Sequence, residues 1–196
     1  MRDMLFIIPM KDPLKAKSRL SDVLPEPVRA RLALALFRRM LGFLSEARPE
    51  VTMLVVSDSD VIEAEALALG AQVLRQSGAG LNAAVREGAE WAKAQEYRAI
   101  CVLPADLAYP SKADLDRLLE IRGGVVMAPA HDGGTNALLV SPPDAIEFRY
   151  GKGSCLAHQE AAALAGVPCT IIPLESLKYD IDTSADLARV RGVKWA

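Results

Sequence analysis

Short apolar runs alternate along the chain with longer segments in which apolar residues recur at the helical period. Val28, Leu32, Leu36, Met40 and Leu44 lie four residues apart, which predicts one apolar face of a helix. Further helices are predicted at residues 61–69, from 80 to about 95, after Ser111, at 155–165 and at 184–190. The apolar runs predict strands at residues 4–8, 51–56, 71–74, 99–103, 125–128, 137–140 and 170–173. This alternation favours an α/β fold with a mostly parallel sheet and helices on both faces.

The bulk properties narrow the class of protein. The chain has 196 residues without a repeat or a low-complexity linker, so we expect one domain over residues 1–196. A net charge of −2 gives no electrostatic support for binding nucleic acid or a membrane surface. The first apolar run ends at Pro9 and is too short for a signal segment or a membrane span, so we expect a cytoplasmic protein.

Three cysteines, Cys101, Cys155 and Cys169, are scattered and form no CxxC pair. This spacing is not typical of a disulfide framework or a zinc site. We expect all three to be free, buried thiols.

Ligands of open α/β sheets bind at the carboxyl ends of the strands, so polar residues that follow the strands are the candidates for function. Four cations follow the first strand between residues 11 and 19, namely Lys11, Lys15, Lys17 and Arg19. A cationic loop in this place can bind a triphosphate and offset the charge of leaving pyrophosphate. An ordinary solvated basic loop is the alternative. Ser57 lies at the same predicted edge, after the second strand.

Carboxylates follow two other segments. Asp106 comes directly after an apolar strand that ends at Pro104, and Asp180 and Asp182 would share one face of an extended segment. Mg²⁺ prefers one or two carboxylates together with substrate phosphates, so either Asp180 or Asp182 could join Asp106 in a metal site. For Asp182, capping of the last helix is the alternative.

Two glycine-rich loops are candidates for binding an anion. Gly151 and Lys152 precede a predicted helix with Ser154 at its N-cap, where backbone N–H groups and the helix dipole favour an anion. An ordinary capped helix start is the alternative. Thr135 and Asn136 follow a second glycine pair, which a simple turn would also explain.

The chain has two histidines. We expect His158, inside a helix, to be a surface or packing residue, and we assign no catalytic role to His131.

Six segments in this order resemble one known family, the 2-phospho-L-lactate guanylyltransferases of deazaflavin coenzyme (F-420) biosynthesis. They are Ile8-Pro9 with Ala16-Lys17-Ser18-Arg19-Leu20, Gly80-Leu81-Asn82, Pro104-Ala105-Asp106-Leu107, Gly134-Thr135-Asn136-Ala137-Leu138, Phe148-Arg149-Tyr150-Gly151-Lys152-Gly153-Ser154 and Asp180-Ile181-Asp182-Thr183. Each segment alone is weakly specific, but together they span nearly the whole chain.

The resemblance implies a single-domain nucleotidyltransferase of the glycosyltransferase-A type. It implies GTP as donor, Mg²⁺ as cofactor and a phosphorylated three-carbon acid as acceptor: phosphoenolpyruvate first, or 2-phospho-L-lactate or 3-phospho-D-glycerate. Ala108 stands where the family often has proline, and the loop before Gly133 is short, so the acceptor stays open.

The resemblance also assigns roles to residues. Catalysis falls to Lys17, Asp106 and Asp182, and the metal to Asp106, Asp180 and Asp182. The acceptor-binding residues would be Thr135, Asn136, Gly151, Lys152 and Ser154. The nucleotide-binding residues would be Pro9, Lys11, Lys17, Arg19, Ser57 and Asn82.

In the implied reaction, an acceptor phosphate oxygen attacks the α-phosphorus of GTP and pyrophosphate leaves. A phosphomonoester has a second pKa of about 6, so no general base is needed at neutral pH. Two rivals remain: a sugar-nucleotide or molybdopterin nucleotidyltransferase of the same fold, and a GTP-binding regulatory module without turnover. A homodimer is left open as the assembly.

Overall fold

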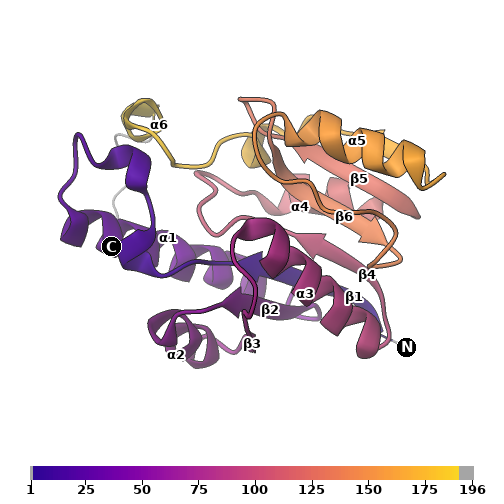
Figure 1. Ribbon diagram of the computed structural model, residues 1–196, viewed down its shortest axis with the longest axis horizontal. Helices are drawn as coiled ribbons and strands as arrows, with labels where there is room; N and C mark the ends of the chain where they lie inside the picture. The colour runs from indigo at the N-terminus through magenta and orange to yellow at the C-terminus, as the bar shows by residue number, and fades with distance from the viewer. Residues whose placement is uncertain (1, 190–196) are drawn as a thin grey trace.

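A single mixed sheet of seven strands forms the centre of the molecule (Figure 1), in a computed structural model that describes residues 2–189. The strands lie in the order β3-β2-β1-β4-β6-β5-β7. Only β6 runs antiparallel to its neighbours β4 and β5; all other pairs are parallel. The strands are β1 (Arg2–Pro9), β2 (Thr52–Ser57), β3 (Gln72–Arg75), β4 (Tyr97–Val102), β5 (Gly124–Pro129), β6 (Thr135–Ser141) and β7 (Cys169–Ile171). The predicted α/β fold with a mostly parallel sheet is confirmed.

Helices cover both faces of this sheet, as the alternating pattern predicts. On one face, α1, α2 and α4 pack against Phe6 and Ile8 of β1; on the other, α3 and α5 share a core with Leu5 and Ile7. Successive residues of a strand point to opposite faces, so one apolar strand serves two cores. The helices are α1 (Glu26–Ala47), α2 (Asp60–Ala68), α3 (Leu81–Ala94), α4 (Lys112–Glu120), α5 (Ser154–Leu164) and α6 (Ser184–Arg189).

The predicted apolar face of α1 is buried only in part. Leu36, Met40 and Leu44 are fully buried, whereas Val28 and Leu32 are half-buried. The difference arises because the first turns of α1 extend past the sheet. There Leu32 and Leu36 pack in a small cluster with Ala108 and Ile181. The start of α1 therefore supports the segments that follow β4 and precede α6.

Loops within residues 2–189 contain three single-turn 3-10 helices that were not predicted from the sequence: η1 (Pro13–Lys15), η2 (Ser18–Leu20) and η3 (Glu175–Leu177). Asp12 caps η1 by accepting from the N–H of Leu14 at 2.9 Å. The loop after β1 is thus folded rather than extended.

The cysteines lie partly as expected. All three are free, and Cys101 is buried, but Cys155 and Cys169 are half-buried. The expectation of burial is wrong for these two because they lie on α5 and on the edge strand β7, where part of each residue stays open to solvent.

Across residues 2–189, no helix combines the length and the apolar character needed to span a membrane.

Candidate active site

A cleft of about 590 Å³ opens at the edge of the sheet where β1 and β4 end and β6 begins. Because β6 is antiparallel to β4, its first residues lie at the same edge as the last residues of the parallel strands. The cleft is lined by residues from several loops and strand ends, among them Lys11, Lys17, Asp106, Thr135, Asn136, Asp180 and Asp182. Polar residues predicted separately from distant parts of the chain thus meet at one place.

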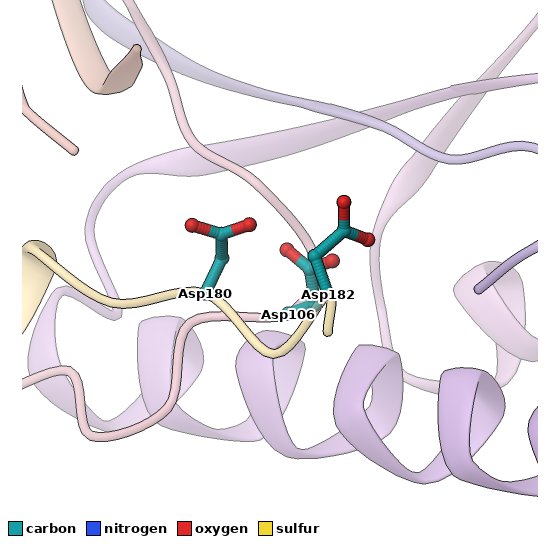
Figure 2. Close-up of side chains that lie close together, drawn as sticks. All are labelled: Asp106, Asp180 and Asp182. Atoms are coloured by element: carbon teal, nitrogen blue, oxygen red, sulfur yellow. The ribbon is translucent and has the colours of Figure 1, made fainter. Parts of the chain in front are cut away.

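Three carboxylates converge in this cleft (Figure 2). One oxygen from each of Asp106, Asp180 and Asp182 lies within 4.8 Å of the others, and the three side chains point the same way. A short antiparallel bridge between Leu107 and Asp180 brings the two segments together. The buried side chain of Ile181 then anchors the second segment below the cleft.

The loop that carries Asp106 is fixed from several sides by backbone bonds. The N–H of Ala108 donates to the carbonyl of Tyr179 at 2.8 Å, and the N–H of Ile181 donates to the carbonyl of Asp106 at 3.1 Å. Arg39 of α1 donates to the carbonyl of Ala108 at 2.7 Å. Hydrogen-bonded backbone therefore supports the carboxylate cluster, although Asp106 and Asp180 are 74 positions apart in the sequence.

Lys17 faces the carboxylates from the loop after β1. Its backbone is left-handed, with φ of 55°, which turns the side chain inward, and its ammonium pairs with Asp106. The ammonium also lies 3.7 Å from Asp182, and Arg19 pairs with Asp182 at 3.0 Å. Burial opposes the charge on Lys17, but the carboxylates of Asp106, Asp182 and Asp180 together outweigh it, so the pKa of Lys17 is raised.

The electrostatics of the cluster suit a cation. Burial, followed by the negative charge of Asp106, raises the pKa of Asp180, so the carboxylates repel one another. Three carboxylates within reach of one another are the hard oxygen donors that a divalent cation prefers. The donor set thus fits a metal ion.

The alternative role of Asp182 as a helix cap is wrong. Thr183 caps α6 instead: its Oγ1 accepts from the N–H of Asp186 at 3.4 Å, while its own N–H donates to the Asp186 carboxylate at 2.8 Å. This reciprocal pair is a capping box with Asp in place of Glu. Asp182 is left to face Lys17 and Arg19.

Of the residues expected to bind nucleotide, some line the cleft and others lie outside its lining. Pro9, Lys11 and Lys17 line the cleft. Arg19 is mostly exposed and turns towards Asp182. Ser57 is fully buried, and its Oγ accepts from the N–H of Ser59 at 3.1 Å, so it supports the loop from below.

Asn82 also has a supporting place. Its side chain accepts from the N–H of Tyr150 at 2.7 Å and donates to the carbonyl of Tyr150 at 3.0 Å. It thereby ties the start of α3 to the loop that precedes α5.

The loop between β3 and α3 forms a wall of the cleft, and only its last residue, Gly80, belongs to the segments that resemble the family. Gln76 donates to the carbonyls of Gly78 at 2.6 Å and Gly80 at 2.9 Å, and Glu87 accepts from the N–H groups of Ser77 at 2.8 Å and Gly78 at 2.7 Å. A Cβ on Gly78 would lie 2.9 Å from both Ala83 Cβ and Glu87 Oε1, so a larger residue would have to displace the start of α3 or the bonds that Glu87 makes. The glycines could have indicated this loop from the sequence. Gln76 and Glu87, which fold it, could not, because Gln and Glu are common on protein surfaces. Asp58, one of the polar residues that follow the second strand, also lines the cleft.

On the other side of the cleft, Thr135 and Asn136 are the first residues of β6 rather than a loop before it. The Asn136 amide donates to the carbonyl of Leu177 at 2.9 Å and to Asp180 at 3.3 Å. The Ser154 hydroxyl donates to Thr135 Oγ1 at 3.3 Å. The predicted Ser154 cap is wrong, because Gly153, with φ of 69°, takes the N-cap position and leaves Ser154 inside the first turn.

Gly151 and Lys152 are exposed. Neither is among the residues that line the cleft in the part of the chain that the structure describes. Both belong to the turn that leads from Tyr150 into α5.

The two histidines differ. His158 is completely buried and makes a hydrogen bond with Thr135. Of the two alternatives predicted for it, a packing residue is therefore right and a surface residue is wrong. His131 stacks on Tyr179 and lies 3.8 Å from Asp186, away from the carboxylate cluster.

Known proteins resemble the chain along most of its length. A model of the family described as "Guanylyl transferase CofC like" matches residues 4–191. A 3-phospho-D-glycerate guanylyltransferase of Colwellia psychrerythraea is 41% identical, over 92% of this chain and 88% of that protein. A phosphoenolpyruvate guanylyltransferase of Rubrobacter xylanophilus is 40% identical, over 94% and 91%. A 2-phospho-L-lactate guanylyltransferase of Methanothermobacter thermautotrophicus is 34% identical, over 94% and 82%.

Solved structures support the fold independently. A nucleotidyl transferase from Methanothermobacter thermautotrophicus superposes with a TM-score of 0.71 at 16% identity, covering 97% of each chain. A 4-diphosphocytidyl-2C-methyl-D-erythritol synthase superposes with a TM-score of 0.67 at 15% identity, over 97% of this chain and 98% of the other. At these identities the likeness is one of fold alone, and it is the nucleotidyltransferase fold. The family match and the relatives above 30% identity add the activity: the chain belongs to the CofC-like guanylyl transferase family and is a guanylyltransferase.

Proposed function

We propose that this enzyme joins the guanylyl group of GTP to a phosphorylated three-carbon acid and releases pyrophosphate, as a step of coenzyme F-420 biosynthesis. One observation carries the proposal: three carboxylates and the buried Lys17 ammonium face one another in a single cleft. Relatives named for all three phospho-acids support it. Phosphoenolpyruvate is the acceptor we expect first, with 2-phospho-L-lactate and 3-phospho-D-glycerate as the alternatives.

The reaction forms one bond and breaks one. A phosphate oxygen of the acceptor bonds to the α-phosphorus of GTP, and the bond from that phosphorus to the bridging oxygen of the β-phosphate breaks. The electron pair leaves on pyrophosphate. The acceptor phosphate is largely dianionic at neutral pH, since its second pKa is about 6, so no side chain must remove a proton.

Catalysis then rests on position and charge. Lys11 and Lys17 line the cleft, where their charges would offset those of the triphosphate. Mg²⁺, held by Asp106, Asp180 and Asp182, would supply charge neutralisation and Lewis acidity. The raised pKa of Lys17 keeps its ammonium charged at neutral pH. Thr135 and Asn136, at the opposite wall, are the residues we assign to the acceptor.

The backbone of residues 76–80 is the wall we assign to the nucleotide. Gln76 and Glu87 brace this loop by four hydrogen bonds to its backbone, and Gly78, Ala79 and Gly80 line the cleft. A preorganised loop loses less conformational entropy when a ligand binds.

The test is a turnover screen of the purified protein. GTP and Mg²⁺ are incubated with each of the three phospho-acids in turn, and pyrophosphate release is followed, with a reaction lacking acceptor as control. We expect release with at least one acid. Equal turnover of ATP, CTP or UTP would refute GTP as the donor. GTP binding without pyrophosphate release from any acid would indicate a regulatory module instead.

A further inference from the structure

His158 occupies a central position beside the cleft. It belongs to α5, is completely buried, and makes a hydrogen bond with each ring nitrogen. Its Nε2 accepts from the backbone N–H of Arg149 at 3.0 Å. Its Nδ1 lies 3.1 Å from Thr135 Oγ1. His158 thus links the loop before α5 to the first residue of β6.

These two bonds fix the tautomer of the ring. A backbone N–H can only donate, so Nε2 of His158 must be the unprotonated nitrogen. A neutral imidazole then carries its hydrogen on Nδ1, which donates to Thr135 Oγ1. Burial lowers the pKa of His158 to about 4, which agrees with a neutral ring at physiological pH.

The bonds around Thr135 fix the direction of its hydroxyl in turn. Its Oγ1 accepts from His158 Nδ1 at 3.1 Å and from the Ser154 hydroxyl at 3.3 Å. A hydroxyl oxygen has two acceptor positions and one hydrogen, so these bonds fill both acceptor positions. Only the hydrogen of Thr135 remains, and the residue lines the cleft.

We propose that His158 is a positioning residue that makes the Thr135 hydroxyl a fixed donor to an anionic oxygen of the acceptor. The proposal rests on the proposed function, because it needs an acid as the second substrate. A donor held in this state favours a carboxylate or phosphate oxygen and disfavours a neutral donor group. His158 therefore contributes to selection of the substrate without touching it.

The same geometry rules out a more familiar role for a histidine next to a hydroxyl. A general base would need its lone pair directed at Thr135, but that nitrogen carries the hydrogen because the lone pair at Nε2 receives Arg149 N–H. Thr135 is therefore not activated as a nucleophile. This agrees with a transfer directly between the two substrates.

Two variants separate the two bonds of His158. In His158→Asn the amide nitrogen takes the place of Nδ1 and can still donate to Thr135, while the Arg149 N–H loses its partner. In His158→Gln the amide oxygen takes the place of Nε2 and keeps Arg149, while the donor to Thr135 is lost. Circular dichroism and thermal unfolding verify that both variants fold.

The measurement is KM for the acceptor and for GTP in both variants. We expect His158→Gln to raise the acceptor KM about tenfold, the scale of one hydrogen bond to a charged group, and to leave the GTP KM unchanged. His158→Asn should keep an acceptor KM near that of the wild type and unfold at a lower temperature. Equal acceptor KM values in the two variants, raised or not, would overturn the proposal.

A double-mutant cycle with Thr135→Val tests whether His158 acts through Thr135. Valine keeps the shape of threonine and lacks the hydroxyl, so His158→Gln should cause no further rise in acceptor KM in this background. A further tenfold rise there would show that His158 acts by another route.

Pyrophosphate release by the wild type separates this inference from the proposed function. If the wild type turns over and the variants do not differ, only the positioning role fails. If the wild type releases no pyrophosphate, the proposed function fails, and the calorimetric Kd of phosphoenolpyruvate for the same variants still decides the role of His158. Absence of any binding by the wild type would contradict both.

Discussion

Lys17 and Asp106 form the innermost ion pair of the cleft, and each depends on the other. Lys17 is almost fully buried, and a buried ammonium is costly unless a carboxylate faces it. Asp106 in turn needs a positive charge nearby, because the carboxylates of Asp180 and Asp182 lie beside it. The ammonium and a bound cation would both lower the repulsion among these carboxylates.

Replacement of Asp106 by Asn should remove most of the activity and leave the fold intact. The metal would lose a ligand, and its contribution of several kcal/mol to the transition state corresponds to a loss of about a hundredfold or more in kcat. Asp182 still lies 3.7 Å from Lys17, so the ammonium keeps a partner. Steady-state kinetics at saturating Mg²⁺, with circular dichroism as the check on folding, measure this. Turnover close to that of the wild type would contradict the metal role.

The stability of the protein should depend on pH through His158. Unfolded histidine has a pKa of about 6.5, whereas folded His158 has a pKa of about 4 because of burial and the nearby Arg149 charge. Between these values the unfolded chain binds a proton that the folded protein does not. The contribution of His158 to the free energy of unfolding is therefore fully present above pH 6.5. It is lost as the pH falls towards 4, by up to about 1.4 kcal/mol per pH unit.

His158→Phe provides the matched control, because it keeps a ring beside Tyr150 and cannot titrate. All other groups contribute alike to both proteins. Urea unfolding from pH 7 to pH 4 should show the stability difference between wild type and variant shrinking as the pH falls. A constant difference would mean that His158 does not have a depressed pKa.

Among the elements of the fold, the turn into α6 carries two acidic residues, four positions apart, that have different functions. Asp182 faces Lys17 and Arg19 in the cleft, whereas Asp186 accepts from the N–H and the hydroxyl of Thr183. In Figure 1 the segment before α6 crosses the molecule to reach the loop after β1, where Arg19 meets Asp182. The turn therefore both caps a helix and presents a carboxylate.

Two isosteric variants should separate these roles. Asp182→Asn should lower kcat strongly and leave Tm nearly unchanged. Asp186→Asn should lower the free energy of unfolding by about 1 kcal/mol or more, because it weakens the cap. Thermal unfolding and turnover of both variants measure the effect of each change on stability and on catalysis. A loss of Tm without loss of turnover in Asp182→Asn would return that residue to a structural role.

The loop between β3 and α3 is the second element with a testable role. Glu87→Gln should raise the KM for GTP and leave that of the acceptor unchanged, because Ser77 and Gly78 donate to different carboxylate oxygens and glutamine replaces one of these oxygens by an NH2 donor. Glu90→Gln, on the same helix and exposed, is the control and should change neither. An acceptor KM that rises with the GTP KM unchanged would reverse the assignment of the two walls.

At the scale of the whole molecule, the sequence predicts the elements well and their arrangement less well. Within residues 2–189 the apolar periods locate the strands and α-helices but not the three 3-10 helices, because only the longer elements bury a face whose spacing is visible locally. The order of the strands and the antiparallel β6 depend on pairings such as Leu5 with Ile100, which no local pattern contains. The first turns of α1 show the limit, since Val28 and Leu32 follow the helical period yet leave the main core.

The same distinction holds for the cleft. Charged and carboxylate residues after strands, such as Lys17, Asp106 and Asp182, can be found because their edge of the sheet follows from strand direction. Residues that act by supporting others cannot be found this way. Ser57 and Asn82 look like ligands of a nucleotide, but their bonds to backbone could not be foreseen, and Gln76 carries no signal at all.

Phosphorus NMR of the complete reaction is the most direct test of guanylyl transfer to a phospho-acid. The purified protein is incubated with GTP, Mg²⁺ and phosphoenolpyruvate, and then with each alternative acid. Our prediction is that signals of a new diphosphate linkage between guanosine and the acid grow together with pyrophosphate, one for one, and that both grow at least about a hundredfold more slowly in Asp106→Asn. Pyrophosphate that appears with GMP and without a new linkage, or no change in the GTP signals with any of the three acids, would contradict it.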